Sequence, residues 1–305
     1  MAQTSIEWVK NSDGTRGFTV NPIRFRNKET GKVGHYCEKV SPGCKNCYAS
    51  RMQKGPYLSG LEFIAENKGC GELFFDEKVL QEVLRRRKPS TFFWCDMTDL
   101  FGPWVPDEWI DRIAAVCALT PQHRHLWLTK RAKRMRDYMA DRCCKPGHYK
   151  ILRTEQTGLA PTTADWPLPN VGLGVSVEDR AHLDRLDDLR KTSAALRWVS
   201  FEPLLEDLGM IDLEGIGWAV AGGESGPGAR PFDVAWARSI VRQCKVAGVP
   251  AFVKQLGAKP YAGKMPDSCA APLGLGLKHS KGADASEWPE DLRVRELPEF
   301  LGGSL

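Results

Sequence analysis

The sequence predicts an α/β protein built as a TIM-barrel-like (β/α) barrel, either closed or incomplete. Short apolar runs recur along the chain, and each is followed by polar residues and then by a stretch with helical periodicity. Continuous apolar strands of this kind are typical of a parallel sheet that is buried on both faces. The 305 residues suffice for one barrel, which usually takes about 250 residues, together with additional segments.

Six apolar runs rich in Val, Phe, Trp and Leu are the expected strands. They are Thr91–Cys95, His125–Leu128, Val171–Val177, Leu196–Phe201, Trp218–Ala221 and Ala251–Val253. Between them, apolar residues three or four positions apart predict helices with one buried face. The three clearest stripes lie within Val79–Leu84, Ile110–Cys117 and Val234–Cys244. Strand and helix therefore alternate, as they do around a parallel sheet.

We expect the chain to divide near residue 260. Residues 1–260 form the barrel with an N-terminal cysteine-cluster loop, and residues 261–305, rich in Gly, Pro and charge, form an irregular extension packed on it. No apolar run approaches the ~20 residues that cross a bilayer, and the N-terminus does not resemble a signal peptide. We therefore expect a cytoplasmic protein without membrane association. The net charge of +5 permits a nucleic-acid partner without requiring one.

Charged or hydrogen-bonding residues follow each of the six expected strands. They are Asp96 and Asp99, Lys130, Glu178, Glu202, the segment Gly222-Gly223-Glu224, and Lys254. The carboxyl ends of parallel strands meet at one edge of such folds, where reactive residues gather. Loops are polar in most proteins and helices often begin with acids, so one such residue alone would mean little. Six ends in a row favour a shared polar site.

The segment from Cys37 to Cys47 is the strongest chemical signal. Cys44 and Cys47 have C-x2-C spacing, and Ser41-Pro42-Gly43 would turn the chain and bring Cys37 back as a third ligand. Three thiolates suit a [4Fe–4S] cluster that leaves one iron open. The open iron can bind S-adenosylmethionine (SAM), and electron transfer from the reduced cluster then yields a carbon radical. A helix beginning near Tyr48 would direct its positive end toward the cluster.

Two other interpretations of these cysteines stay open at this point. The three thiols could hold a structural zinc ion together with His35, or they could be loop cysteines without a shared ligand. Among the ten cysteines of the chain, Cys117 and Cys244 are expected in the core, and Cys143 and Cys144 in a loop.

The segment Cys37–Ala49 resembles the K-V-S-P-G-C-x-x-C-Y-A signature of a phage-associated protein family, common in phages and prophages, without a settled substrate. Further segments match in order over nearly the whole chain: Ile6-Glu7-Trp8, Asn21-Pro22, Asp96–Phe101, Leu128–Arg131, Leu173–Asp179, Phe201–Leu204, Gly222–Pro231 and Lys254-Gln255. The resemblance implies a TIM-barrel-like fold and distant kinship to radical SAM enzymes. The pattern departs from theirs, since six residues instead of three separate the first two cysteines, and Tyr48 follows the last cysteine.

Our leading hypothesis is a radical SAM enzyme with a reducing electron donor; the phage association of the family suggests that this enzyme modifies or rearranges a base of phage DNA or its appended group. Its [4Fe–4S] cluster is bound by Cys37, Cys44 and Cys47. The residues expected to bind SAM are Tyr48, Lys130, Gly222, Gly223 and Glu224, and those expected to be catalytic are Asp96, Asp99, Glu178, Glu202 and Lys254. One alternative is a zinc-stabilised nucleic-acid-binding protein without SAM chemistry. The other is a barrel hydrolase or nuclease that uses its carboxylates with a divalent metal.

Overall fold

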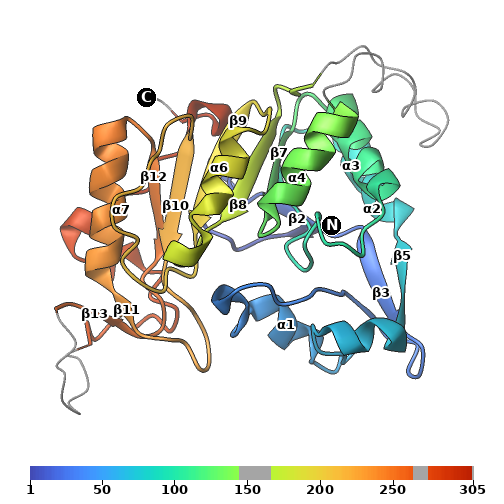
Figure 1. The fold of residues 1–305 in the computed structure, drawn as a ribbon, viewed down its shortest axis with the longest axis horizontal. Coiled ribbons are helices and arrows are strands. Elements are labelled where there is room, and N and C mark those ends of the chain that lie inside the picture. The colour runs from blue at the N-terminus through green and yellow to red at the C-terminus, as the bar shows by residue number, and fades with distance from the viewer. Residues whose placement is uncertain (144–165, 264–273, 304–305) are drawn as a thin grey trace.

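The computed structural model describes residues 1–143, 166–263 and 274–303, which fold around one large sheet (Figure 1). Its eight strands follow the order β1-β2-β6-β7-β8-β9-β10-β12. Their bounds are Ala2–Gln3, Phe18–Val20, Thr91–Trp94, Arg124–Thr129, Val171–Ser176, Leu196–Phe201, Trp218–Gly222 and Ala251–Gln255. All neighbours are parallel except β1 and β2. The expected parallel sheet is confirmed, and its six predicted strands correspond to β6 through β10 and β12.

The sheet is open in the described part of the chain. Strands β1 and β12 form its two edges, and no pairing joins them. The sequence allowed a closed or an incomplete barrel, and these residues form the incomplete one. The first parallel strand, β2, has only three residues, and this short run was missed by the search for apolar stretches.

Helices cover one side of the sheet (Figure 1). They are α2 (Glu77–Arg85), α3 (Asp107–Leu119), α4 (Ala132–Tyr138), α6 (Asp184–Arg190) and α7 (Val234–Ala247). Helix α7 is capped at both ends: the side chain of Asp233 accepts a hydrogen bond from Ala235 N, and Gly248 adopts a left-handed φ of 67°. Cys117 and Cys244 are buried in the core as expected. The prediction that Cys143 lies in a loop is wrong, because the chain continues from α4 into the π-helix η3 (Met139–Cys143), which ends at this residue. Cys144 lies outside the described residues.

The opposite face of the sheet is filled by the two ends of the chain. Side chains alternate between faces along a strand, so Phe93, Trp198 and Phe252 point to this side, where Trp8 and Leu301 pack on them. Close packing here requires glycine in β8, because a Cβ at position 174 would lie 2.4 Å from the indole of Trp198. The amino-terminal half of this face is thereby apolar, and its polar residues lie toward the carboxyl ends of the strands.

An insertion between β2 and β6 carries the cysteine segment. It contains an antiparallel sheet of order β4-β3-β5, formed by Val33–Gly34, Ile23–Asn27 and Gly71–Phe75. It also contains helix α1 (Tyr48–Gln53) and the short 3-10 helices η1 (Pro42–Cys44) and η2 (Ala65–Cys70). Because it follows β2, it lies at the carboxyl end of the parallel strands (Figure 1).

The C-terminal residues run along the β12 edge. Val253 N donates to Val294 O at 2.8 Å, and Glu296 N donates to Ala251 O at 2.9 Å. A parallel pair, β11 (Phe232–Asp233) and β13 (Pro260–Tyr261), and the 3-10 helices η5 (Ala285–Glu287), η6 (Glu290–Leu292) and η7 (Glu299–Leu301) complete this part. The division at residue 260 stays a prediction. No helix in the described ranges has the length and apolar character needed to cross a bilayer.

Candidate functional site

The cysteine loop has the local structure that its sequence predicts. Ser41-Pro42-Gly43-Cys44 forms a tight turn in which Cys44 N donates to Ser41 O at 2.9 Å. Cys47 is the residue before helix α1, and its carbonyl accepts from Arg51 N at 3.1 Å. The turn reverses the chain between the first and second cysteine, and the start of α1 directs backbone N–H groups toward the third.

The three thiols are free, partly exposed and close enough to influence one another electrostatically. Burial raises the pKa of Cys37, and the negative charge of Asp99 raises it further; Arg131 acts in the opposite direction, and Cys47 and Cys44 add smaller increases. Burial also raises the pKa of Cys47, against which Lys130 acts. Two cations therefore lie where deprotonated thiolates would need compensation.

His35 is not placed to complete a zinc site with these thiols. It is buried, its Nδ1 lies 3.0 Å from Ile23 O, and its Nε2 lies 3.4 Å from Arg24 Nη1. Within the described ranges, no three His, Cys, Asp or Glu side chains are arranged to hold one metal ion. The interpretation of the cysteines plus His35 as zinc ligands is not supported, because both ring nitrogens face other partners.

Glu178 connects the cysteine loop to the end of β8. Its side chain is fully buried, and its Oε1 accepts from Ser41 Oγ at 2.5 Å and from Lys130. Arg185 Nη1 donates to Oε2 at 2.7 Å. Burial favours the neutral acid, but Lys130 and Arg185 outweigh it and hold the pKa of Glu178 below its usual value. The fit requires glycine at position 43, since a Cβ there would lie 2.4 Å from Glu178 Oε1.

Glu224 makes a second connection, from the end of β10. Asn46 Nδ2, between the last two cysteines, donates to Glu224 Oε2 at 2.9 Å. Arg230 binds both carboxylate oxygens, at 2.6 Å and 3.0 Å, and donates to Pro42 O at 3.0 Å. Burial would raise the pKa of Glu224, but the hydrogen bonds from Arg230 and Asn46 lower it below its usual value.

Tyr48 makes the third connection, to the end of β6. Its hydroxyl donates to the backbone oxygen of Asp96 at 2.7 Å and lies 3.2 Å from the carboxylate. Asn21 Nδ2, just after β2, donates to Asp96 Oδ1 at 2.6 Å. Burial raises the pKa of Asp96, although both hydrogen bonds act in the opposite direction. The cysteine loop is thus attached to the carboxyl ends of three strands.

Glu202 and Lys254 form a separate ion pair at the same edge. Lys254 Nζ lies 3.2 Å from Glu202 Oε1, and Ser200 Oγ donates to the other oxygen at 3.3 Å. Gly222 provides the space for this carboxylate, because a Cβ at that position would lie 2.8 Å from Glu202 Oε1. Both side chains of the pair keep some exposure, at 13% and 21%, and can therefore meet a ligand.

Comparison with known protein families matches residues 21–284 to the family described as "Protein of unknown function (DUF5131)". The chain belongs to the DUF5131 family. The match includes the cysteine loop and every strand end described above. Among solved structures, a mutant of spore photoproduct lyase is similar to this DUF5131 chain at 12% identity, with a TM-score of 0.33, covering 80% of this chain and 70% of that chain. No curated protein matches the sequence. The phage association stays a prediction.

In this DUF5131 chain Asp99, one of the expected catalytic residues, has its carboxylate occupied by protein groups. Asp99 is buried and accepts from Thr129 Oγ1 at 2.6 Å, from Arg131 Nη1 at 2.8 Å and from the backbone N–H of Phe101 at 3.0 Å. Asp99 therefore fixes the end of β7 and orients the side chain of Arg131.

Sequence reasoning missed the partners that attach the cysteine loop. They are Asn21, Ser41, Asn46, Arg185 and Arg230. All but Arg185 lie within or beside the segments matched by the family resemblance, so those matches could have indicated that these residues take part in the site. Arg185 stands on an ordinary charged helix, and only the folded structure shows its contact with Glu178.

Proposed function

We propose that this chain is a radical SAM-type enzyme in which Cys37, Cys44 and Cys47 bind a [4Fe–4S] cluster. The observation that carries the proposal is a loop with three free thiols attached to the carboxyl ends of β6, β8 and β10. When bound, a reduced cluster and SAM supply a 5′-deoxyadenosyl radical at this edge of the sheet.

The chain supplies the number of donors that such a cluster needs, because three free cysteines come from one loop. Within the described residues their thiols are not gathered around one metal position, so cluster binding requires the loop to bring them together. Lys130 and Arg131 reduce the repulsion among thiolates, since they act on Cys47 and Cys37. Three thiolates leave one corner of a four-iron cluster for another ligand.

The surrounding side chains divide into anchors and exposed groups. Glu178 and Glu224 bind protein cations and loop groups through both oxygens, so we assign them to positioning the loop. Glu202 and Lys254 keep exposure, and we assign them to contacts with SAM or substrate. Tyr48, whose side chain is partly exposed, would contact the cofactor from α1.

The same contacts argue against a hydrolase that binds a divalent metal through its carboxylates. Glu178 faces Lys130 and Arg185, Glu224 faces Arg230, and Glu202 faces Lys254. Carboxylates that bind a hard cation together need their charges uncompensated, whereas here each of these three already has a protein cation.

The substrate that we propose is a nucleic-acid base or a group appended to it, with electrons from a reducing donor. The net charge of +5 is compatible with a polyanionic substrate. This part is tested separately, by asking whether added DNA is altered or increases SAM cleavage.

The decisive experiment is anaerobic reconstitution of the full chain with iron and sulfide, followed by SAM and dithionite. We expect about four irons per chain, charge-transfer absorption from the cluster, and release of 5′-deoxyadenosine. Cys44→Ala should lose iron and 5′-deoxyadenosine, whereas Cys70→Ala, a change at an exposed cysteine outside the loop, should lose neither. An intact cluster that releases no 5′-deoxyadenosine would contradict the SAM chemistry, and full iron loading of Cys44→Ala would contradict the cluster site.

A further inference from the structure

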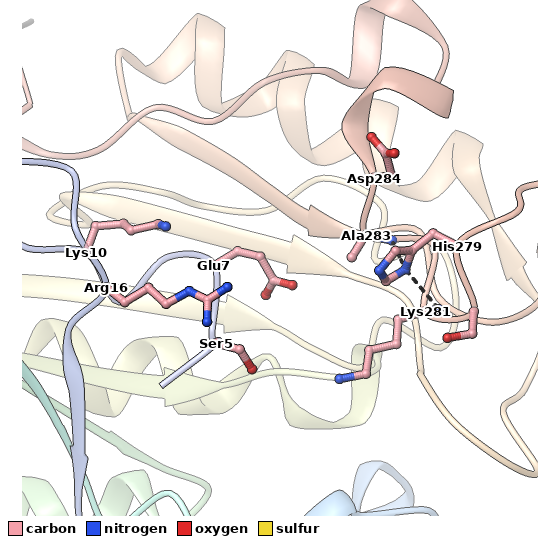
Figure 2. Close-up of a pocket in the computed structure, with 9 residues that line it drawn as sticks. Ser5, Glu7, Lys10, Arg16, His279, Lys281, Ala283 and Asp284 are labelled. Carbon is pink, nitrogen blue, oxygen red and sulfur yellow. Dashed lines mark hydrogen bonds between the residues drawn. The ribbon is translucent and has the colours of Figure 1, made fainter. Parts of the chain in front are cut away.

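A pocket lies between the two ends of the chain, and no residue of the cysteine loop lines it (Figure 2). Its volume is about 490 Å³, within the usual range for small-molecule sites of roughly 300–1,000 Å³. One wall comes from the residues before β2 and the other from residues 279–284, which follow the β12 edge of the sheet. The pocket therefore lies on the side where the two edge strands of the sheet, β1 and β12, stay apart.

The first wall places two cations side by side. Lys10 and Arg16 form an isolated antiparallel bridge, and directly opposite residues of such a bridge have side chains on the same face. Like charges in this arrangement repel each other. Neither residue forms an ion pair with a carboxylate of the described ranges, so an external anion would relieve the repulsion.

The second wall is held rigidly and presents further donors. Gly282 adopts a left-handed φ of 58°, and its carbonyl accepts from Leu256 N at 2.9 Å and from Trp288 Nε1 at 3.0 Å. His279 Nδ1 accepts from the backbone N–H groups of Lys281 and Ala283, both at 3.2 Å. The hydrogen of the neutral ring therefore sits on Nε2, which can only donate. The ammonium of Lys281 extends toward Ser5 across the pocket (Figure 2).

Two carboxylates, Glu7 and Asp284, also line the pocket. Asp284 accepts from Ser286 N at 2.9 Å and from Ser286 Oγ at 2.7 Å, and it points away from the other lining side chains (Figure 2). Glu7 lies among the cations, but it makes no ion pair within the described part of the chain (Figure 2). Three cations, Lys10, Arg16 and Lys281, thus line the pocket together with two carboxylates, so the cations are in excess.

We propose that this pocket binds a phosphate group, from a phosphorylated small molecule or from a nucleic-acid backbone. The planar fork of Arg16 matches phosphate oxygens, and Lys10, Lys281 and the serine hydroxyl of Ser5 add donors. The proposal is independent of the cysteine loop, so it does not depend on the radical chemistry.

The test uses the full chain and two probes: inorganic phosphate in isothermal titration, and a fluorescein-labelled single-stranded 12-mer in fluorescence anisotropy at several salt concentrations. Arg16→Gln and Lys281→Gln should each weaken binding about tenfold, and for the oligonucleotide each should lower the salt slope by about one. Glu7→Gln should strengthen binding about threefold, because it removes the competing charge. Arg242→Gln, a change at an exposed cation on α7, is the matched control and should bind as the unaltered protein does.

The two probes distinguish the sources. Tighter binding of the 12-mer identifies a nucleic-acid backbone, and binding of phosphate alone identifies a small phosphorylated ligand; either supports the site if the two wall variants weaken it. The proposal is overturned if neither probe binds the unaltered chain. It is equally overturned if Arg16→Gln and Lys281→Gln, folded by circular dichroism, bind with unchanged affinity.

Discussion

Replacing Glu178 by glutamine tests the contact network that joins the cysteine loop to the sheet. The carboxylate is fully buried and binds Lys130, Arg185 and Ser41. Glutamine keeps one acceptor oxygen, but it removes the negative charge and turns an N–H group toward one of the cations. Removing one partner of a buried ion pair typically costs about 3–5 kcal/mol, because the remaining charge stays buried without compensation. We expect Glu178→Gln to lower the free energy of unfolding by about 3 kcal/mol.

The assay is urea unfolding at pH 7, followed by the fluorescence of the ten tryptophans. The matched control is Glu214→Gln, a change at an exposed glutamate before β10, which should alter stability by less than about 0.5 kcal/mol. An unchanged urea midpoint for Glu178→Gln would refute the reasoning. Reconstitution of the same variant should also bind less iron, because one amide oxygen cannot hold Ser41, Lys130 and Arg185 together as the carboxylate does.

The pH dependence gives an internal check on this variant. Lys130 and Arg185 hold the pKa of folded Glu178 below its ordinary value of 4.5. The unfolded chain therefore binds the proton first as the pH falls, and the stabilisation is present above about pH 4.5 and is lost below it. The stability difference between the two proteins should shrink in acid, and a difference that stays constant through this range would contradict the assignment.

Three further changes follow from the packing and the buried groups. Gly43→Ala places a methyl group 2.4 Å from Glu178 Oε1, so we expect a loss of about 1–3 kcal/mol in urea unfolding and less iron after reconstitution. Gly174→Ala places one 2.4 Å from the rigid indole of Trp198, and a similar loss should appear in urea unfolding without a change in the affinity of the cysteine loop for iron. Burial lowers the pKa of His125 to about 3, so below pH 6.5 the unfolded chain binds this proton before the folded protein does. The free energy of unfolding that His125 contributes should therefore fall by about 2 kcal/mol between pH 7 and pH 5. His125→Asn should flatten this dependence of stability on pH, and an unchanged slope would contradict the reasoning.

The sequence by itself determined the local structure. Short apolar runs located β6 through β10 and β12, because strands buried on both faces must be apolar throughout. Asp233 and Gly248 marked the two ends of α7, and Ser41-Pro42-Gly43 marked the turn before the second cysteine. These signals depend on residues that are neighbours in the chain, so the sequence alone is sufficient to predict them.

Only the tertiary structure decided which of the polar residues act together. Ser41 and Glu178 are 137 positions apart, and Asn46 and Glu224 are 178 apart, so no local pattern could pair them. The sequence placed Asp99 in the same group as Glu202, yet folding directs it to Arg131 and the end of β7. Whether the sheet closes was likewise undetermined, since that depends on how the two chain ends pack against its open face rather than on any strand's own residues.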